Sequence, residues 1–267
     1  MNVVFRFFLV AILFVSCTKD EYKKPSYISF NLKNDSIYVN IEKKSIHPTF
    51  LKIDDRINKK EQYIDFVKEG TKTILKFKQV EIDTNYIIEN YHFNLFYGTS
   101  NLKKYDTLYN YGLPFLKGKR YKVLQGNNGG YSHNKITSRY AIDFKMNVGQ
   151  EVCAIREGLV INVKDHFDKN GTSKKYLNKA NLILVYHKDG TFVQYGHFKK
   201  DGVLVKIGDT IKKGQLIGYS GNTGMSSEPH LHFTIYKPTK KGLVSIPFIL
   251  DSISSKKYKK GKYARNN

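Results

Sequence analysis

The chain has 267 residues, of which 40% are hydrophobic, and its aromatic share of 14% comes from Tyr and Phe without any Trp. This length suits one large or two modest domains, and this composition indicates a folded, β-rich protein rather than a disordered one. The formal charge of +22 favours anionic partners. We predict neither a nucleic acid nor a nucleotide as partner, because the sequence has no nucleic-acid-binding motif of the usual kinds and no phosphate-binding loop.

The N-terminus is similar to a secretory signal of the bacterial lipoprotein type. Arg6 precedes a short apolar run, residues 7–15, and then come a small residue and Cys17. The run is too short to span a bilayer. We therefore expect that residues 1–17 are a signal, that Cys17 becomes the lipidated first residue, and that the exported protein is membrane-anchored, in the periplasm or at the cell surface. A cleaved signal with an incidental cysteine and an uncleaved anchor stay open as alternatives, because Phe14 departs from the commonest lipoprotein pattern.

Residues 18–112 are predicted to form an accessory β domain. Short runs rich in β-branched and aromatic residues are separated by turn residues, which is typical of a small antiparallel β-sandwich. The predicted strands cover residues 27–32, 36–41, 50–53, 71–80, 86–90 and 91–97. No spacing of carboxylates in this region requires a metal, so we expect these side chains to be solvated: Asp54, Asp55, Glu61 and Asp65. The domain would serve for spacing, binding or occlusion of another site.

Residues 113–250 are predicted to form a second domain, an antiparallel β-sheet in which compact apolar strands alternate with Gly-rich turns. The strands are expected within residues 156–163, 181–187, 191–198, 215–221 and 230–236. Residues 165–179 are polar and rich in Lys, and we expect a surface loop there. Cys153 stands in an apolar run and is predicted to be a buried small hydrophobe. Residues 251–267 form a basic tail, either disordered in solvent or attracted to an anionic wall polymer or lipid headgroups.

Two histidines one residue apart are the main candidate site residues of the second domain. His230 and His232 should point to the same face of a strand, because side chains alternate along it, while Leu231 turns into the core. Such a pair alone is more often an ordinary surface feature. Upstream, however, His133, Asp143 and His197 also lie in segments that we interpret as strands or strand ends, and together they make a set of metal-ligating groups.

At this point the sequence resembles the M23 (LytM/lysostaphin-type) zinc endopeptidases, over about residues 125–236. The similarity rests on SHNKITSRYAIDF, REGLV, KANLILVYHKDGTFVQYGHF and VKIGDTIKKGQLIGYSGNTGMSSEPHLHF, in unbroken order. The resemblance implies that the zinc ligands are His133, Asp143 and His232, and that His197 and His230 are the catalytic pair. Two imidazoles and one carboxylate without a thiolate suit Zn²⁺ and leave one coordination position open, as in catalytic sites. Peptidoglycan, cut in its stem or cross-bridge peptides, is the implied substrate.

Smaller features carry their own expectations. Phe198 replaces the more usual Leu of the family motif, and Glu228 stands where many relatives have Gly and could tune the groove. Tyr195 would share the strand face of His197, and catalytic support and ordinary packing are equally open for it. Asn181 is expected to fix a turn rather than to touch substrate. We assign no site role to the histidines without a motif: His47, His92, His166 and His187.

Two functions of other classes remain as alternatives. One is a catalytically inactive domain of the same fold that binds and activates a cell-wall amidase, which the survival of every ligand and both catalytic histidines disfavours. The other is a surface adhesin in which the first domain is the functional part. Zinc content together with wall digestion separates the three, and the sequence does not indicate which peptidoglycan bond would be cut.

Overall fold

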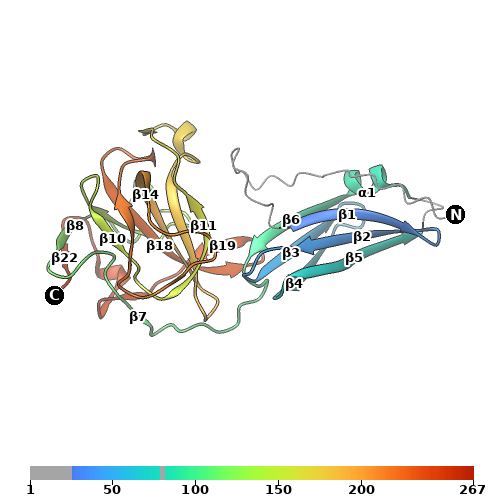
Figure 1. Ribbon diagram of the computed structural model, residues 1–267, viewed down its shortest axis with the longest axis horizontal. Helices are drawn as coiled ribbons and strands as arrows, with labels where there is room; N and C mark the ends of the chain where they lie inside the picture. The colour runs from blue at the N-terminus through green and yellow to red at the C-terminus, as the bar shows by residue number, and fades with distance from the viewer. Residues whose placement is uncertain (1–25, 79–81) are drawn as a thin grey trace. The chain divides into compact units, whose positions relative to one another are not determined.

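The computed structural model describes residues 26–78 and 82–267. The predicted signal with Cys17 lies outside the described residues. The chain divides into two compact units, the first ending at Ser100 and the second comprising Asn101–Asn267 (Figure 1). Within the described ranges, no helix has both the length and the apolar character needed to cross a membrane.

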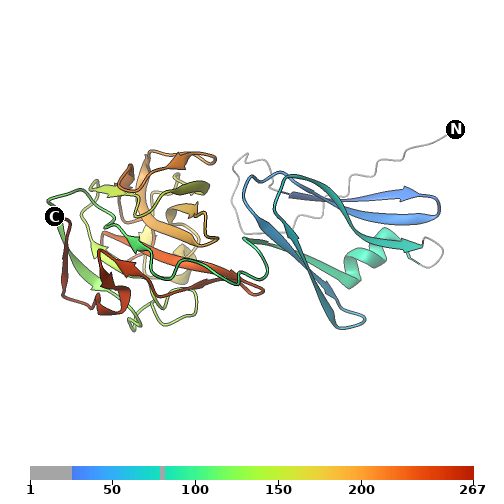
Figure 2. The same cartoon turned by 90° about the horizontal axis from the view of Figure 1, so that it is seen from below.

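The first unit consists of two antiparallel three-stranded sheets, with strand orders β1-β2-β5 and β4-β3-β6 (Figures 1 and 2). The strands are β1 (Ser26–Lys33), β2 (Ser36–Lys43), β3 (Thr49–Asp55), β4 (Lys60–Phe66), β5 (Gly70–Lys78) and β6 (Tyr91–Tyr97). Apolar side chains of both sheets, such as Val39, Leu51 and Phe93, join one buried core. The predicted all-β class is confirmed for this unit, since two sheets share a core as in a small sandwich.

The predicted strand over residues 86–90 is wrong, because these residues belong to the helix α1 (Thr84–Asn90). The Asp83 side chain caps the helix by accepting a hydrogen bond from the Tyr86 amide at 2.8 Å. Ile87 is then fully buried in the core of the unit. The paired isoleucines favour a strand locally, but the N-cap and the burial of one of them stabilise a helix instead.

The second unit is built on an 11-stranded sheet (Figure 1). Its main path has the order β15-β11-β13-β14-β18-β9-β8-β22, and β10, β16 and β19 pair beside that path. The bounds are β8 (Arg120–Gln125), β9 (Ile142–Lys145), β10 (Glu151–Cys153), β11 (Gly158–Lys164), β13 (Asn181–Tyr186), β14 (Phe192–Val203), β15 (Thr210–Ile211), β16 (Leu216–Ser220), β18 (His230–Thr239), β19 (Gly242–Ser245) and β22 (Tyr263–Arg265). All of these pairs are antiparallel, so the predicted antiparallel β-sheet is confirmed.

Short elements complete the unit. β7 (Asn110–Tyr111), β20 (Ile249–Leu250) and β21 (Ile253–Ser254) form a small sheet, and β12 (Asn170–Gly171) pairs with β17 (Gly224–Met225). Residues 165–179 are otherwise loop, apart from the 3-10 helix η1 (Lys174–Tyr176). Leu231 is fully buried in the core of the unit, as the alternation along β18 predicts, and the buried Cys153 is a free thiol.

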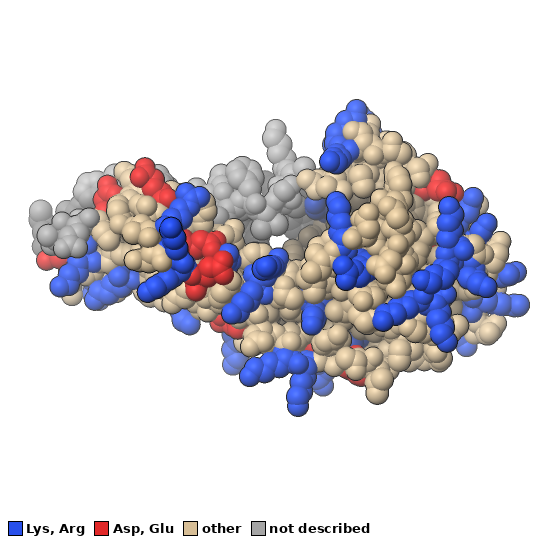
Figure 3. Space-filling model, turned by 180° about the vertical axis from the view of Figure 1, so that it is seen from behind, with Lys and Arg blue, Asp and Glu red and all other residues tan. Residues whose placement is uncertain are grey.

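The basic C-terminal segment is part of the fold. Residues 251–267 contain β21, the 3-10 helix η2 (Ser255–Lys257) and β22, which pairs with β8 and so extends the sheet. Tyr258 is buried and its hydroxyl donates a hydrogen bond to the carbonyl of Leu250 at 2.9 Å. Lys and Arg side chains spread over much of the face of this unit shown in Figure 3, with few Asp and Glu among them.

Candidate metal centre

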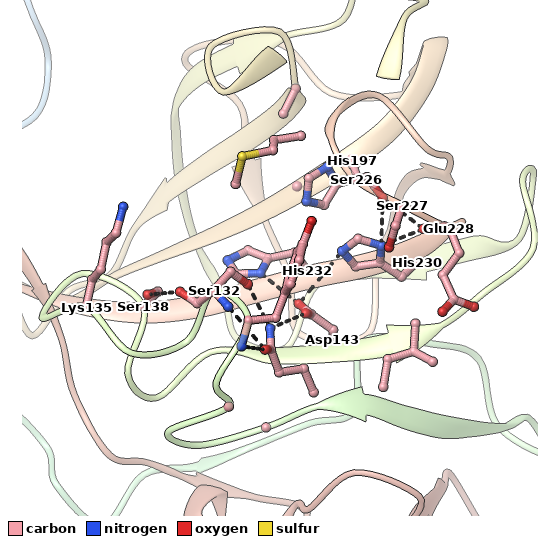
Figure 4. A pocket seen from close by; sticks show the side chains of 18 of the residues that line it. Ser132, Lys135, Ser138, Asp143, His197, Ser226, Ser227, Glu228, His230 and His232 are labelled. Atoms are coloured by element: carbon pink, nitrogen blue, oxygen red, sulfur yellow. Dashed lines mark hydrogen bonds and ion pairs between the residues drawn. The ribbon is translucent and has the colours of Figure 1, made fainter. Parts of the chain in front are cut away.

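Sheet register brings the first two candidate ligands together. On β18, His232 lies directly opposite Asp143 of β9 on one side and Gly196 of β14 on the other. Cross-strand neighbours on one face of an antiparallel sheet have Cβ atoms about 5 Å apart, close enough for their side chains to meet. The His232 Nδ1 atom lies 2.8 Å from Oδ1 of Asp143. His230 points to the same side of β18, as predicted, and its Nε2 is 3.9 Å from the same oxygen (Figure 4).

His133 reaches the site from a loop rather than from a strand end, which differs from the expectation. The segment between β8 and β9 consists of turns, and the His133 amide donates to the carbonyl of Gly129 at 3.0 Å. Its imidazole is fully buried, and Nδ1 donates to the Gly126 carbonyl at 3.2 Å. Nε2 therefore carries the lone pair in the neutral ring, and it lies 3.2 Å from Oδ2 of Asp143.

His197 enters the site through a β-bulge. Gly196 and Phe198 of β14 pair with the adjacent residues Leu182 and Asn181 of β13, which leaves His197 as the extra residue. Its φ of 67° is unusual for a residue with a side chain. A bulge bends the strand and redirects one side chain, and bulges are frequent beside active sites. His197 thus faces His230 and His232, with ring centroids 4.4 and 5.9 Å away.

The three candidate ligands fit a metal cation. One ligand atom from each of His133, Asp143 and His232 lies within 4.8 Å of the others. The buried Nε2 of His133 makes no hydrogen bond, although it faces a carboxylate oxygen. The Thr234 hydroxyl oxygen lies 3.0 Å from Nε2 of His232 and can accept a hydrogen bond from it, so that Nδ1 of this ring also presents a lone pair to Asp143. Lone pairs that point at a buried carboxylate repel its negative charge, and a cation bound between them would remove this repulsion.

The charge state of Asp143 agrees with this arrangement. Burial by itself would raise the pKa of this carboxyl, but the imidazoles of His133, His232 and His230 beside it hold the pKa well below its usual range. Burial lowers the pKa of His232, opposed by the interaction with Asp143. An ionised carboxylate beside neutral imidazoles is the protonation state in which these groups ligate metals.

His197 and His230 are held in one orientation by backbone carbonyls. Nδ1 of His197 donates to the Thr223 carbonyl at 2.6 Å, and Nδ1 of His230 donates to the Glu228 carbonyl at 2.8 Å. Each ring consequently turns Nε2 away from these loops, free to exchange a proton or a hydrogen bond. Burial, followed by the neighbouring His230 and His232, lowers the pKa of His197 to about 3, which keeps the ring neutral at pH 7.

One residue that supports the cluster was not identified from the sequence. Gln125, at the end of β8, donates from Nε2 to Oδ2 of Asp143 at 3.2 Å and to Oγ of Ser132 at 2.7 Å. Its Oε1 accepts from the amides of Tyr131 and Ser132. Gln125 thereby connects the carboxylate to the loop that carries His133. A single glutamine at a strand end has no motif, so only the register between β8 and β9 could have indicated it.

All five predicted site residues except the fully buried His133 line one groove of about 930 Å³. Figure 4 shows Lys135 and Glu228 on opposite sides of the cluster. Asn181 has the expected turn-fixing role, since its amide group bonds both backbone groups of Phe167 at 2.9 Å. Tyr195 is fully buried and its hydroxyl accepts from the Ile155 amide at 2.8 Å, so packing is its role and it does not share the face of His197.

Histidines without a motif lie elsewhere. His187 is fully buried, and its Nδ1 contacts the Thr191 hydroxyl at 3.0 Å. His47 and His92 belong to the first unit, and the His166 ring packs against Phe167 with centroids 4.0 Å apart. None of them joins the metal-ligating group found among the described residues.

Comparison with known proteins gives a family for the second unit. The chain is 30% identical to an uncharacterized metalloprotease of Buchnera aphidicola subsp. Baizongia pistaciae over 80% of this chain and 61% of that protein. It is 39% identical to the glycyl-glycine endopeptidase ALE-1 of Staphylococcus capitis, over 40% of this chain and 25% of that protein. Identity with the peptidoglycan DD-endopeptidase ShyA of Vibrio cholerae is 31%, over 38% of this chain and 21% of that protein.

The chain thus spans less than two thirds of the length of each of these relatives. The family model of peptidase family M23 matches residues 137–244, which include four of the five predicted site residues and begin just after His133. The antiparallel sheet that carries the metal-ligating group lies largely in the same stretch of chain. Residues 137–244 are a peptidase family M23 domain.

Proposed function

We propose that the second unit is a zinc metalloendopeptidase that hydrolyses peptide bonds in the stem or cross-bridge peptides of peptidoglycan. The observation that carries the proposal is the convergence of two imidazoles and one ionised carboxylate, with ligand atoms within 4.8 Å, beside two further histidines in an open groove. ALE-1 is named a glycyl-glycine endopeptidase and ShyA a peptidoglycan DD-endopeptidase, and these activities of the relatives support the substrate class.

His133, Asp143 and His232 would hold the zinc ion. When bound, zinc supplies Lewis acidity that polarises a carbonyl and lowers the pKa of a coordinated water to about 7. The chain contributes rigid geometry: Asp143 and His232 are fixed by strand register, and His133 is fixed through Gly126 and Gln125. Three protein ligands are the number that a catalytic rather than a structural zinc site uses.

His197 and His230 would handle protons at the reacting peptide. With Nδ1 of each ring donating to a backbone carbonyl, Nε2 is the atom that would accept a proton from the nucleophile and, once protonated, donate a hydrogen bond to the developing oxyanion. The low pKa of His197 favours its neutral form, which can act as an acceptor. The His230 ring lies between the Ser226 hydroxyl, 3.1 Å from its Nδ1, and the cluster, which fixes its position.

We further propose that the protein is exported and held at a membrane by lipid on Cys17. The support is the short apolar run that ends in a small residue and a cysteine. An extracytoplasmic address would place the groove in the same compartment as peptidoglycan. The bond that is cut stays open, because ALE-1 and ShyA carry names for different endopeptidase activities.

Two variants on the same strand test the assignment. His232→Ala should lose both zinc and activity, whereas His230→Ala should keep zinc while activity falls by about 10²–10⁴-fold, the usual contribution of a positioned acid or base. Release of soluble muropeptides from purified wall is measured together with zinc content on the same samples. Because the two residues are neighbours on β18, a general folding defect would affect both variants alike.

The outcomes separate the alternatives. Loss of zinc in His230→Ala with zinc retained in His232→Ala would reverse the roles. Full activity in both variants would exclude a zinc peptidase. A wild-type protein that binds zinc but only stimulates a wall amidase would support the inactive-domain alternative. Absence of both wall digestion and amidase stimulation would favour an adhesin.

A further inference from the structure

Three lysines line the groove without a carboxylate partner among the described residues. Lys259 and Lys260 of the C-terminal segment and Lys135 of the loop after β8 line the same groove as the histidine cluster. Within the part of the chain that the structure describes, none of these three side chains makes an ion pair with a carboxylate. Glu228, across the cluster from Lys135 (Figure 4), is paired with Lys145 at 3.3 Å. Asp143 is engaged by the histidines.

The position of Lys259 and Lys260 is fixed by the sheet and does not depend on a free tail. Val123 of β8 donates to the carbonyl of Lys262 at 2.8 Å, and the Gly261 amide donates back to Val123 at 2.9 Å. Buried Tyr258 anchors the other end of the segment. Two lysines between these anchors have a defined backbone, so only their side chains are free to adjust to a ligand.

Gly126 places this basic segment next to the metal cluster. A Cβ atom at position 126 would collide with the carbonyl oxygen of Tyr258, and the Lys259 amide lies 3.7 Å from the same position. The Gly126 carbonyl is also the acceptor for Nδ1 of His133. Only a glycine allows the C-terminal backbone to approach so closely. The segment that carries Lys259 and Lys260 and the proposed ligand His133 therefore both contact Gly126.

We propose that Lys259 and Lys260, together with Lys135, form a subsite for a free carboxylate of the peptide substrate. The inference rests on the proposed peptidase function and specifies its substrate class as an anionic peptide. Ammonium groups that lack a protein partner at the rim of a groove attract and orient an opposite charge, and this contributes to specificity as well as to the rate of encounter. A membrane or an anionic wall polymer is disfavoured because these lysines line the reaction groove itself.

The experiment uses the full-length, zinc-loaded protein and a pair of soluble muropeptide dimers, one with free carboxylates and one with the same carboxylates amidated. The double variant Lys259→Gln/Lys260→Gln removes the charge with little change in length. The matched control is Lys256→Gln/Lys257→Gln, because these two lysines belong to η2 in the same segment and do not line the groove. Values of kcat/KM for both substrates and zinc content are measured for all three proteins.

We expect the double variant Lys259→Gln/Lys260→Gln, the groove variant, to lose about tenfold in kcat/KM on the free-carboxylate dimer. This loss corresponds to the combined contribution of two partly solvated charge pairs. Its value on the amidated dimer and its zinc content should equal those of the wild type. The control variant should keep the wild-type preference. Added salt should reduce the preference of the wild type, because exposed charge pairs are screened.

Three results would overturn the subsite. The first is a wild type that cleaves both dimers equally well. The second is an equal loss on both dimers in the groove variant. The third is a groove variant whose binding to intact wall or to anionic lipid vesicles decreases while its kcat/KM on soluble dimers is unchanged. In that case the segment would be a docking surface. A zinc-loaded wild type that cleaves neither dimer nor purified wall would instead refute the peptidase function on which the subsite rests.

Discussion

Replacing Gln125 with leucine should weaken zinc binding without unfolding the protein. Leucine keeps a similar volume but removes the hydrogen bond from Nε2 to Oδ2 of Asp143, which is 3.2 Å long. It also leaves the amides of Tyr131 and Ser132 without their acceptor, Oε1. The variant therefore perturbs the proposed ligand Asp143 directly and the loop of the proposed ligand His133 indirectly.

The size of the effect follows from the charge on Asp143. A hydrogen bond to an ionised group contributes about 1.5–3 kcal/mol net. Because about 1.4 kcal/mol corresponds to a factor of ten, the loss predicts zinc binding that is about 10–100-fold weaker. Removal of outer-shell partners of metal ligands typically has an effect of this size, about 10–100-fold. Gln125 is only partly buried, so water can replace part of the interaction and the lower end of the range is expected.

Zinc affinity is measured by titrating the apoprotein against a competing chelator, and thermal unfolding is followed separately. Gln194→Leu is the control, because Gln194 lines the same groove and no hydrogen bond from its side chain is found among the described residues. Wild-type zinc affinity in Gln125→Leu would refute the outer-shell role. An equal loss in both variants would show that the groove responds to any such substitution.

Two further predictions concern the address of the protein and its pH dependence. Cys17→Ser should abolish labelling by fatty acid and release the protein from the membrane fraction, and unchanged labelling and fractionation would contradict the lipoprotein interpretation. Burial lowers the pKa of His187 from 6.5 to about 3, so only the unfolded chain takes up this proton between those values and stability falls as pH falls through that window. His187→Leu should reduce the pH dependence of unfolding of the second unit by about 1 kcal/mol per pH unit below pH 6, and an unchanged slope would argue against it.

The strand that carries His230 and His232 could be predicted because strand periodicity is local. The alternation places Leu231 in the core and both histidines in the groove, and the observed β18 follows it. Apolar runs likewise predicted the neighbouring strands, because short β-branched segments between Gly-rich turns have few other low-energy structures. The all-β class of both units is therefore available from the sequence.

Features that depend on partners distant in sequence could not be predicted in this way. Strict alternation puts His197 on the face of Tyr195, whereas the bulge against β13 separates them. A bulge is set by the pairing of two strands, and a single strand sequence does not reveal it. The helix over residues 84–90 depends on a cap at Asp83 and on burial of Ile87 in a core made by other strands.

Gly126 explains why the C-terminal segment belongs to the site although its composition reads as a tail. Its own carbonyl fixes the tautomer of His133, and its missing side chain makes room for the Tyr258 carbonyl. A displacement of residues 258–260 would therefore be transmitted through one peptide unit to the proposed ligand His133, and a displacement of His133 would move the segment that carries Lys259 and Lys260. A lysine-rich composition predicts solvent-exposed side chains, but it does not predict how the backbone of these residues pairs with other strands. The pairing of β22 with β8 and the close approach at Gly126 place those lysines in the groove, which would couple the proposed metal binding to the proposed recognition of charge.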